Sequence, residues 1–177
     1  MIDPKFTSDD IIVSKVTLAL DIALQHAEET YVQSRKISKN EWFTSVLLKE
    51  LYNSGKGLGF DVPYDVEKTN TNWLYDLIWN GKEKNDEPLL VVEFNLGSDF
   101  RDVRNDFEKL LMARSEIRLL ITFGGDSERE GERALQNIAK LKSQMPHNNS
   151  PTPSEHFLFA TIVPGVNSTY MFQYDFI

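Results

Sequence analysis

The sequence contains no cysteine, which excludes disulfide bonds, thiolate nucleophiles and thiolate metal ligands. Its three histidines are scattered and form no histidine-based metal motif. No apolar run approaches the roughly 20 residues that a membrane-spanning helix needs. Residues 1–5 show no basic segment followed by an apolar one, so no signal peptide is expected. These absences predict a soluble cytoplasmic protein without membrane association.

A basic excess is missing too. The net charge is −8 at pH 7, whereas proteins that coat nucleic acid usually carry a positive excess, because much of their affinity comes from phosphate contacts. An acidic balance by itself indicates only solubility. Any action on nucleic acid would therefore need a local basic patch or a bound cation.

What the sequence does contain is typical of a globular domain. It has 177 residues, of which 41% are hydrophobic and 26% are charged. This length suffices for a sizeable hydrophobic core, and no internal repeat divides the chain. We therefore predict a single domain over residues 1–177.

Hydrophobic periodicity and turn residues place the secondary structure. Asn40 is the expected N-cap of the second helix, and Ser127 with Glu130 fits a capping box before the last helix. The predicted helices cover residues 11–35, 41–53, 100–115 and a segment around 134–141. The predicted strands cover residues 60–68, 73–79, 89–96, 117–123, 156–163 and 169–176.

The order of these elements predicts an α/β protein with a mixed central β-sheet flanked by helices. Consecutive strands joined by short links are expected to be antiparallel. The helix over residues 100–115 is long enough to be a crossover, so the strands 89–96 and 117–123 should be parallel, with a right-handed connection.

The strand 89–96 contains an acid in an otherwise apolar run, and burying a lone carboxylate is costly unless it has a partner. Side chains alternate between the two faces of a strand. Glu93 and Asn95 therefore point to one face. The opposite face receives the apolar residues Leu90, Val92, Phe94 and Leu96.

A second acid falls beside Glu93 when the strands 73–79 and 89–96 are paired as a hairpin. With Trp79 opposite Leu90, Asp76 lies opposite Glu93, and directly opposite Cβ atoms are ~5 Å apart. Two adjacent carboxylates repel each other, and a divalent cation would relieve that repulsion. Mg²⁺ is commonly held by one or two carboxylates. The alternative is that a lysine or arginine from a covering helix pairs with Glu93.

This succession of elements and acids resembles the PD-(D/E)XK nucleases, also called the restriction-endonuclease-like superfamily. Tyr75-Asp76 stands where the family has Pro-Asp, and Val92-Glu93-Phe94-Asn95 stands where it has Glu-x-Lys. The resemblance spans residues 41–123. It implies an α-β-β-β-α-β core, preceded by an N-terminal helix and followed by a helix and a β-hairpin.

The resemblance also implies metal-dependent hydrolysis of phosphodiester bonds, in DNA rather than RNA. Mg²⁺ or Mn²⁺ would be held by Asp76, Glu93 and the backbone carbonyl of Phe94, and would activate a water molecule. The family's further acid lies early in the preceding helix. That position favours Glu41 over Glu50.

Asn95 departs from the family pattern because asparagine has no charge to replace that of the motif lysine. On helical angles, Lys109 should face solvent, whereas Arg104 lies at the border of the apolar stripe near the helix start. We therefore take Arg104 as the expected replacement and Asn95 as a residue that orients water.

Two other interpretations stay open. The same fold without catalysis would be a DNA- or protein-binding, regulatory module, which the acidic charge and Asn95 favour. An unrelated α/β protein would use these acids for structure only. The aromatic residues of the last two strands are expected mainly in the core, and part of them would suit a homodimer surface.

Overall fold

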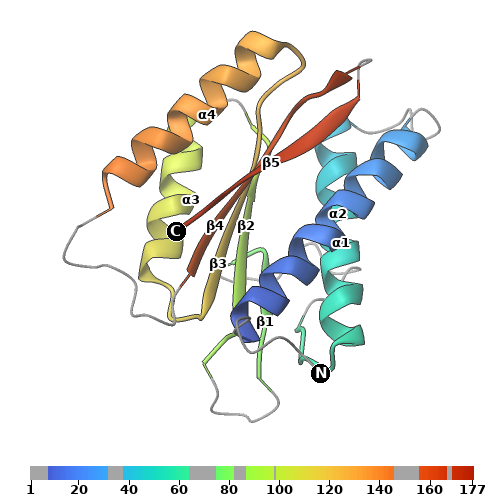
Figure 1. Cartoon of the computed structure of the whole chain (residues 1–177), viewed down its shortest axis with the longest axis vertical. Coiled ribbons are helices and arrows are strands. Elements are labelled where there is room, and N and C mark those ends of the chain that lie inside the picture. The colour runs from blue at the N-terminus through green and yellow to red at the C-terminus, as the bar shows by residue number, and fades with distance from the viewer. Residues whose placement is uncertain are drawn as a thin grey trace.

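The computed structural model describes residues 8–31, 38–63, 75–81, 87–97, 99–145, 156–166 and 169–177. In this part of the chain, four helices flank a five-stranded sheet (Figure 1). The helices are α1 (Ser8–Tyr31), α2 (Lys39–Gly57), α3 (Phe100–Met112) and α4 (Glu128–Ser143). The strands are β1 (Leu77–Trp79), β2 (Leu90–Asn95), β3 (Ile117–Phe123), β4 (His156–Pro164) and β5 (Tyr170–Phe176). The predicted α/β class is confirmed.

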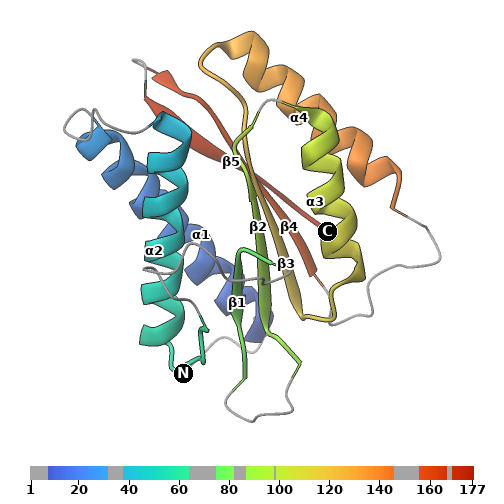
Figure 2. The same cartoon turned by 180° about the vertical axis from the view of Figure 1, so that it is seen from behind.

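The strands follow one another in sequence order across the sheet, from β1 to β5. β1 and β2 are antiparallel, β2, β3 and β4 are parallel to one another, and β5 runs antiparallel to β4. The mixed sheet, the antiparallel first pair and the parallel pair joined by α3 are therefore as predicted. Helices α1 and α2 cover one face of the sheet, and α3 and α4 cover the other (Figures 1 and 2).

Two hydrophobic layers hold this arrangement together, one on each face of the sheet. Leu90 and Val92 belong to the layer that α1 and α2 cover, whereas Val91 belongs to the layer under α3 and α4. Phe94 packs against the first layer as well. The expected alternation along β2 is confirmed, so Glu93 and Asn95 are directed to the α3 side of the sheet.

The predicted strand over residues 60–68 is not seen within the described range. Only Asp61 pairs with Asn80, through an isolated bridge, and residues 64–70 lie outside the described part of the chain. Pro63 has no N–H and cannot continue a ladder. A three-stranded meander before α3 is therefore absent from the described residues, and the α-β-β-β-α-β core stays a prediction.

One of the two predicted helix N-caps is wrong and the other is confirmed. The N-cap of α2 is Ser38, not Asn40, because Ser38 and Glu41 form a reciprocal capping box. Asn40 instead donates from Nδ2 to the Leu96 carbonyl at 2.6 Å, which ties α2 to the end of β2. The capping box of Ser127 and Glu130 is confirmed. None of the helices that the structure describes is long and apolar enough to cross a membrane.

Candidate functional site

The β1–β2 hairpin has the predicted register. Trp79 pairs with Leu90 and Leu77 pairs with Val92, where the ladder ends. Asp76 lies just beyond it, with its N–H bonded to the Val92 carbonyl at 3.1 Å and its carboxyl group close enough to Glu93 to raise the pKa of Glu93. Asp76 ends the ladder with its side chain, because its Oδ2 accepts the Phe94 N–H at 2.7 Å. The two acids that the sequence singled out thus lie together, at the edge of the sheet where β1 begins.

Glu93 is almost fully buried, with 3% of its surface exposed. Its Oε2 accepts a hydrogen bond from Lys109 Nζ at 3.2 Å. Its Oε1 is also buried and has no hydrogen-bond partner among the described residues. A buried carboxylate oxygen without a hydrogen bond is costly, and either a proton, which the raised pKa of Glu93 favours, or a bound ion would relieve that cost.

The cation next to Glu93 is Lys109, which we expected to face solvent. That expectation is wrong, because Lys109 Nζ lies 3.2 Å from Glu93 Oε2 and 2.7 Å from Asp106 Oδ1. Its helix α3 packs over β2 and β3, and a long lysine stem can lie along the helix flank while its ammonium reaches a neighbouring acid. The angular position of a residue around its helix axis does not account for the length of its side chain.

Arg104 is not brought to the two acids. Its Nε donates to Glu108 at 2.8 Å, in a pair one helical turn apart whose side chains are both 53% exposed. Such an exposed pair is ordinary for a helix surface. The charge that we assigned to Arg104 is therefore supplied at Glu93 by Lys109.

Asn95 is 9% exposed and is linked to Lys109 through Asp106 rather than by a direct hydrogen bond. Its Nδ2 donates to Asp106 Oδ2 at 2.8 Å, and its Oδ1 accepts the Gly97 N–H at 3.2 Å. Sequence reasoning missed Asp106. The signal that could have found it is its spacing of three residues from Lys109, which lets an acid and a base on one helix meet.

Glu41 is used elsewhere. It is exposed, and its carboxylate accepts the Ser38 N–H at 3.0 Å and the Ser38 hydroxyl at 2.9 Å. These bonds, the backbone one first, hold the pKa of Glu41 below its ordinary value. Glu41 and Glu50 belong to α2, on the face of the sheet opposite to α3 (Figures 1 and 2). The structure therefore pairs Asp76 and Glu93 with acid and base from α3.

Burial first, and the crowding of acids second, determine the electrostatics of the site. Burial, and then the neighbouring Asp76 carboxylate, raise the pKa of Glu93 from 4.5 to about 8, although Lys109 opposes the shift. Burial also raises the pKa of Asp76. Burial works to lower the pKa of Lys109, but its hydrogen bonds to Asp106 and Glu93 raise it above the ordinary value. Three carboxyl groups thus surround one ammonium, and the raised pKa of Glu93 favours its protonated form at neutral pH.

The donors left free suit a hard divalent cation. Glu93 lies on β2 and Asp76 immediately before β1, and both carry carboxyl groups at this sheet edge. Phe94 lies next to Asp76, because its N–H donates to Asp76 Oδ2 at 2.7 Å. Within the described residues, no group of three or more histidine or acidic side chains is arranged to hold a metal. Two carboxylates, a carbonyl and waters are nevertheless a common Mg²⁺ ligand set.

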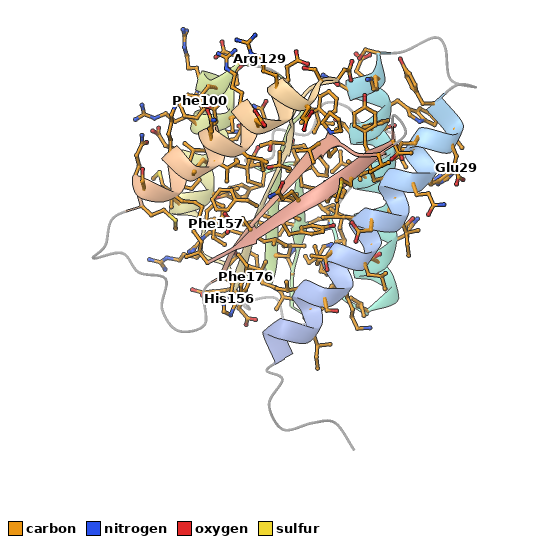
Figure 3. The ribbon with its side chains drawn as sticks, turned by 45° about the horizontal axis from the view of Figure 1, so that its top comes forward. Glu29, Phe100, Arg129, His156, Phe157 and Phe176 are labelled. Carbon is orange, nitrogen blue, oxygen red and sulfur yellow. The ribbon has the colours of Figure 1, made fainter. Side chains whose placement is uncertain are left out.

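A separate cavity of about 540 Å³ lies at the carboxyl ends of β2 and β3. Lys39 and Asp126 line it and form an ion pair, and Lys39 Nζ also lies 2.7 Å from the Tyr170 hydroxyl. A second hollow nearby is bordered by Phe100 and Arg129, at the first turns of α3 and α4 (Figure 3). Neither hollow is lined by Asp76 or Glu93.

Comparisons of this chain with protein-family models, curated proteins and solved structures find no match. The site geometry is therefore the basis for any functional statement.

Proposed function

We propose that this protein hydrolyses phosphodiester bonds in DNA with the help of Mg²⁺ or Mn²⁺. The observation that carries the proposal is a pair of neighbouring acids, Asp76 and Glu93, of which Glu93 is buried and its Oε1 accepts no N–H or hydroxyl hydrogen bond from the described residues. A divalent cation between the two would satisfy that oxygen and cancel their repulsion.

Each residue of the site would have a separate role in this reaction. Asp76, Glu93 and the Phe94 carbonyl would hold the ion. When bound, such an ion polarises a phosphate oxygen and supplies a water of lowered pKa. Lys109 keeps its proton at neutral pH because its pKa is raised. Its ammonium at Glu93 would then donate to a phosphate oxygen, the task of the lysine in the PD-(D/E)XK motif.

The structural interpretation of these acids is the strongest competitor, because a lysine from a covering helix does pair with Glu93. This interpretation does not account for the number of acids around the single lysine. Lys109 Nζ contacts Oε2 of Glu93 and Oδ1 of Asp106, so one ammonium serves three neighbouring carboxyl groups. A purely structural arrangement would need a proton shared between Glu93 and Asp76, which the raised pKa of Glu93 favours, and the bound ion that we propose would replace that proton.

DNA is the expected substrate because of the resemblance to the nuclease superfamily, and the net charge of −8 restricts how it would bind. Phosphate affinity would have to come from the bound ion, Lys109 and nearby exposed arginines rather than from a basic surface as a whole. We therefore expect weak binding of DNA in the absence of divalent metal.

The experiment that tests the proposal is a titration with Mn²⁺, followed by incubation with duplex DNA, single-stranded DNA and RNA. The wild-type protein should bind one ion at millimolar metal and cleave DNA. Asp76→Asn and Glu93→Gln should lose both the ion and the cleavage. Asp126→Asn, which changes an acid of the separate cavity, is the matched control and should retain both.

The outcomes separate the competing interpretations. Absence of bound Mn²⁺ at millimolar concentration would exclude the metal-dependent enzyme and favour structural acids. An ion that binds at Asp76 and Glu93 without cleavage of any nucleic acid would favour the non-catalytic binding module.

A further inference from the structure

The side-chain amide of Asn95 is held in one orientation. Its Oδ1 accepts the Gly97 N–H at 3.2 Å, so only Nδ2 is directed to Asp106 Oδ2, at 2.8 Å. A Cβ atom at residue 97 would lie 3.3 Å from Asn95 Oδ1, and glycine avoids that crowding. Because Asn95 is 9% exposed, solvent offers little competition for either bond.

The Asp106 carboxylate is held at both of its oxygens. Oδ2 accepts from Asn95, and Oδ1 lies 2.7 Å from Lys109 Nζ. The side chain is 15% exposed, which strengthens both interactions relative to a surface pair. A carboxylate bound at one end only could rotate away from the lysine.

Lys109 needs such an anchor. Its ammonium ends a flexible four-carbon stem that is 39% exposed, and its hydrogen bond to Glu93 Oε2 is 3.2 Å long. Holding a lysine in one position costs rotamer entropy. The shorter contact with Asp106, on the same helix, supplies the second point that fixes the ammonium at Glu93.

We infer that Asn95 is a positioning residue for Lys109, acting through Asp106. Asn95, at the place of the motif lysine, is itself uncharged. Through Asp106 it would fix the position of the Lys109 ammonium, which belongs to α3. This inference rests on the proposed function for its catalytic meaning. The arrangement of the three side chains can be tested without any catalysis.

The variants are chosen to break each link separately. Asn95→Ala removes the bond to Asp106, and Asn95→Asp keeps the shape but places a carboxylate against Asp106. Asp106→Asn keeps the shape and removes the charge that holds Lys109. Asn40→Ala is the matched structural control, because Asn40 also uses its amide near the end of β2, on the Leu96 carbonyl at 2.6 Å.

The first measurement is the rate at which the Lys109 amine is methylated by formaldehyde and a borane reductant, followed by mass spectrometry. Asn95→Ala and Asp106→Asn should raise this rate several-fold, whereas Asn40→Ala should leave it unchanged. Asn95→Asp should not raise it, because a further carboxylate favours the protonated amine. Loss of stability alone would affect Asn40→Ala as well. If Asn95→Ala fails to fold, the isosteric Asp106→Asn tests the next link to Lys109.

The second measurement is DNA cleavage in Mn²⁺. Asn95→Ala should lower kcat by roughly 10- to 100-fold, the usual effect of losing a supporting hydrogen bond at a metal site, with KM nearly unchanged. The exchange Asn95→Lys with Lys109→Met should recover most of the activity that Lys109→Met alone loses, because it returns the charge to strand β2.

The results distinguish the two proposals. A wild-type methylation rate and kcat in Asn95→Ala, with Lys109→Met inactive, would overturn the positioning role and leave the nuclease proposal standing. If no form of the protein cleaves nucleic acid, the nuclease proposal fails. The methylation rates then still decide whether Asn95 positions Lys109.

Discussion

Two clusters in this molecule use the same residue types to different effect. In the cavity cluster, Lys39 meets Asp126 and the hydroxyl of Tyr170, and its ammonium lies 4.9 Å from the centre of the Tyr170 ring. In the strand-edge cluster, Lys109 meets Asp106 and Glu93, with Asp76 alongside. The first cluster pairs one lysine with one acid, whereas the second has three acids for one lysine.

The carboxyl groups respond in opposite directions. Hydrogen bonds from Lys39, and then from Tyr170, hold the pKa of Asp126 below its ordinary value. Burial and the charge of Asp76 raise the pKa of Glu93 to about 8. The side chain of Asp126 is 64% exposed and that of Glu93 only 3%. A lysine partner is therefore common to both clusters, and what distinguishes the strand-edge cluster is its buried excess of acids.

The largest expected difference between the clusters is in the pH dependence of stability. The folded-state pKa of Glu93 is raised from 4.5 to about 8, so the folded protein loses stability as pH rises across that interval. At about 1.4 kcal/mol per pH unit, Glu93→Gln should remove a loss of up to about 4 kcal/mol between about pH 5 and about pH 8. Urea unfolding at the two pH values measures it.

The matched change Asp126→Asn should behave in the opposite sense. The pKa of Asp126 is lowered on folding, so its contribution is present at neutral pH and is lost as pH falls. Asp126→Asn should therefore destabilise at neutral pH and have little effect in acid. Equal pH profiles for Glu93→Gln and Asp126→Asn would show that the two clusters do not differ as described.

The next effect is on cleavage. Lys109→Met should lower kcat on the order of 100-fold, about 2.7 kcal/mol of transition-state stabilisation, because it removes the ammonium that faces the phosphate. Lys39→Met should change kcat by less than about twofold and lower the stability by ~1 kcal/mol, since Lys39 ties α2 to the loop before α4. A larger loss of activity in Lys39→Met than in Lys109→Met would place the chemistry in the cavity.

The smallest effect is expected at Arg104. Its pair with Glu108 is exposed, and Arg104→Met should change the free energy of unfolding by only about 0.3–0.5 kcal/mol without affecting cleavage. Thermal unfolding and the DNA assay measure the two quantities. If Arg104→Met is as inactive as Lys109→Met, the charge does come from Arg104, as sequence periodicity indicated.

Much of the site could be derived from the pattern of residues along the strands. A period of two directs Glu93 and Asn95 to one face of β2, because a strand offers no other alternation. The pairing of Trp79 with Leu90 was an assumption that suits the connection after Trp79, and the structure confirms it. The ladder ends at Leu77, and Asp76 still lies near Glu93 although it is outside β1.

What the sequence determined by itself is therefore the place of the two acids, and what only the tertiary structure decided is their surroundings. Lys109 lies outside the apolar stripe of α3, yet the packing of α3 over β2 brings its ammonium to Glu93. Glu41 lies early in α2 as expected, but α2 covers the opposite face and Glu41 caps its own helix. Contacts between elements depend on which face each helix covers and how far a long side chain reaches, and neither follows from periodicity within one element.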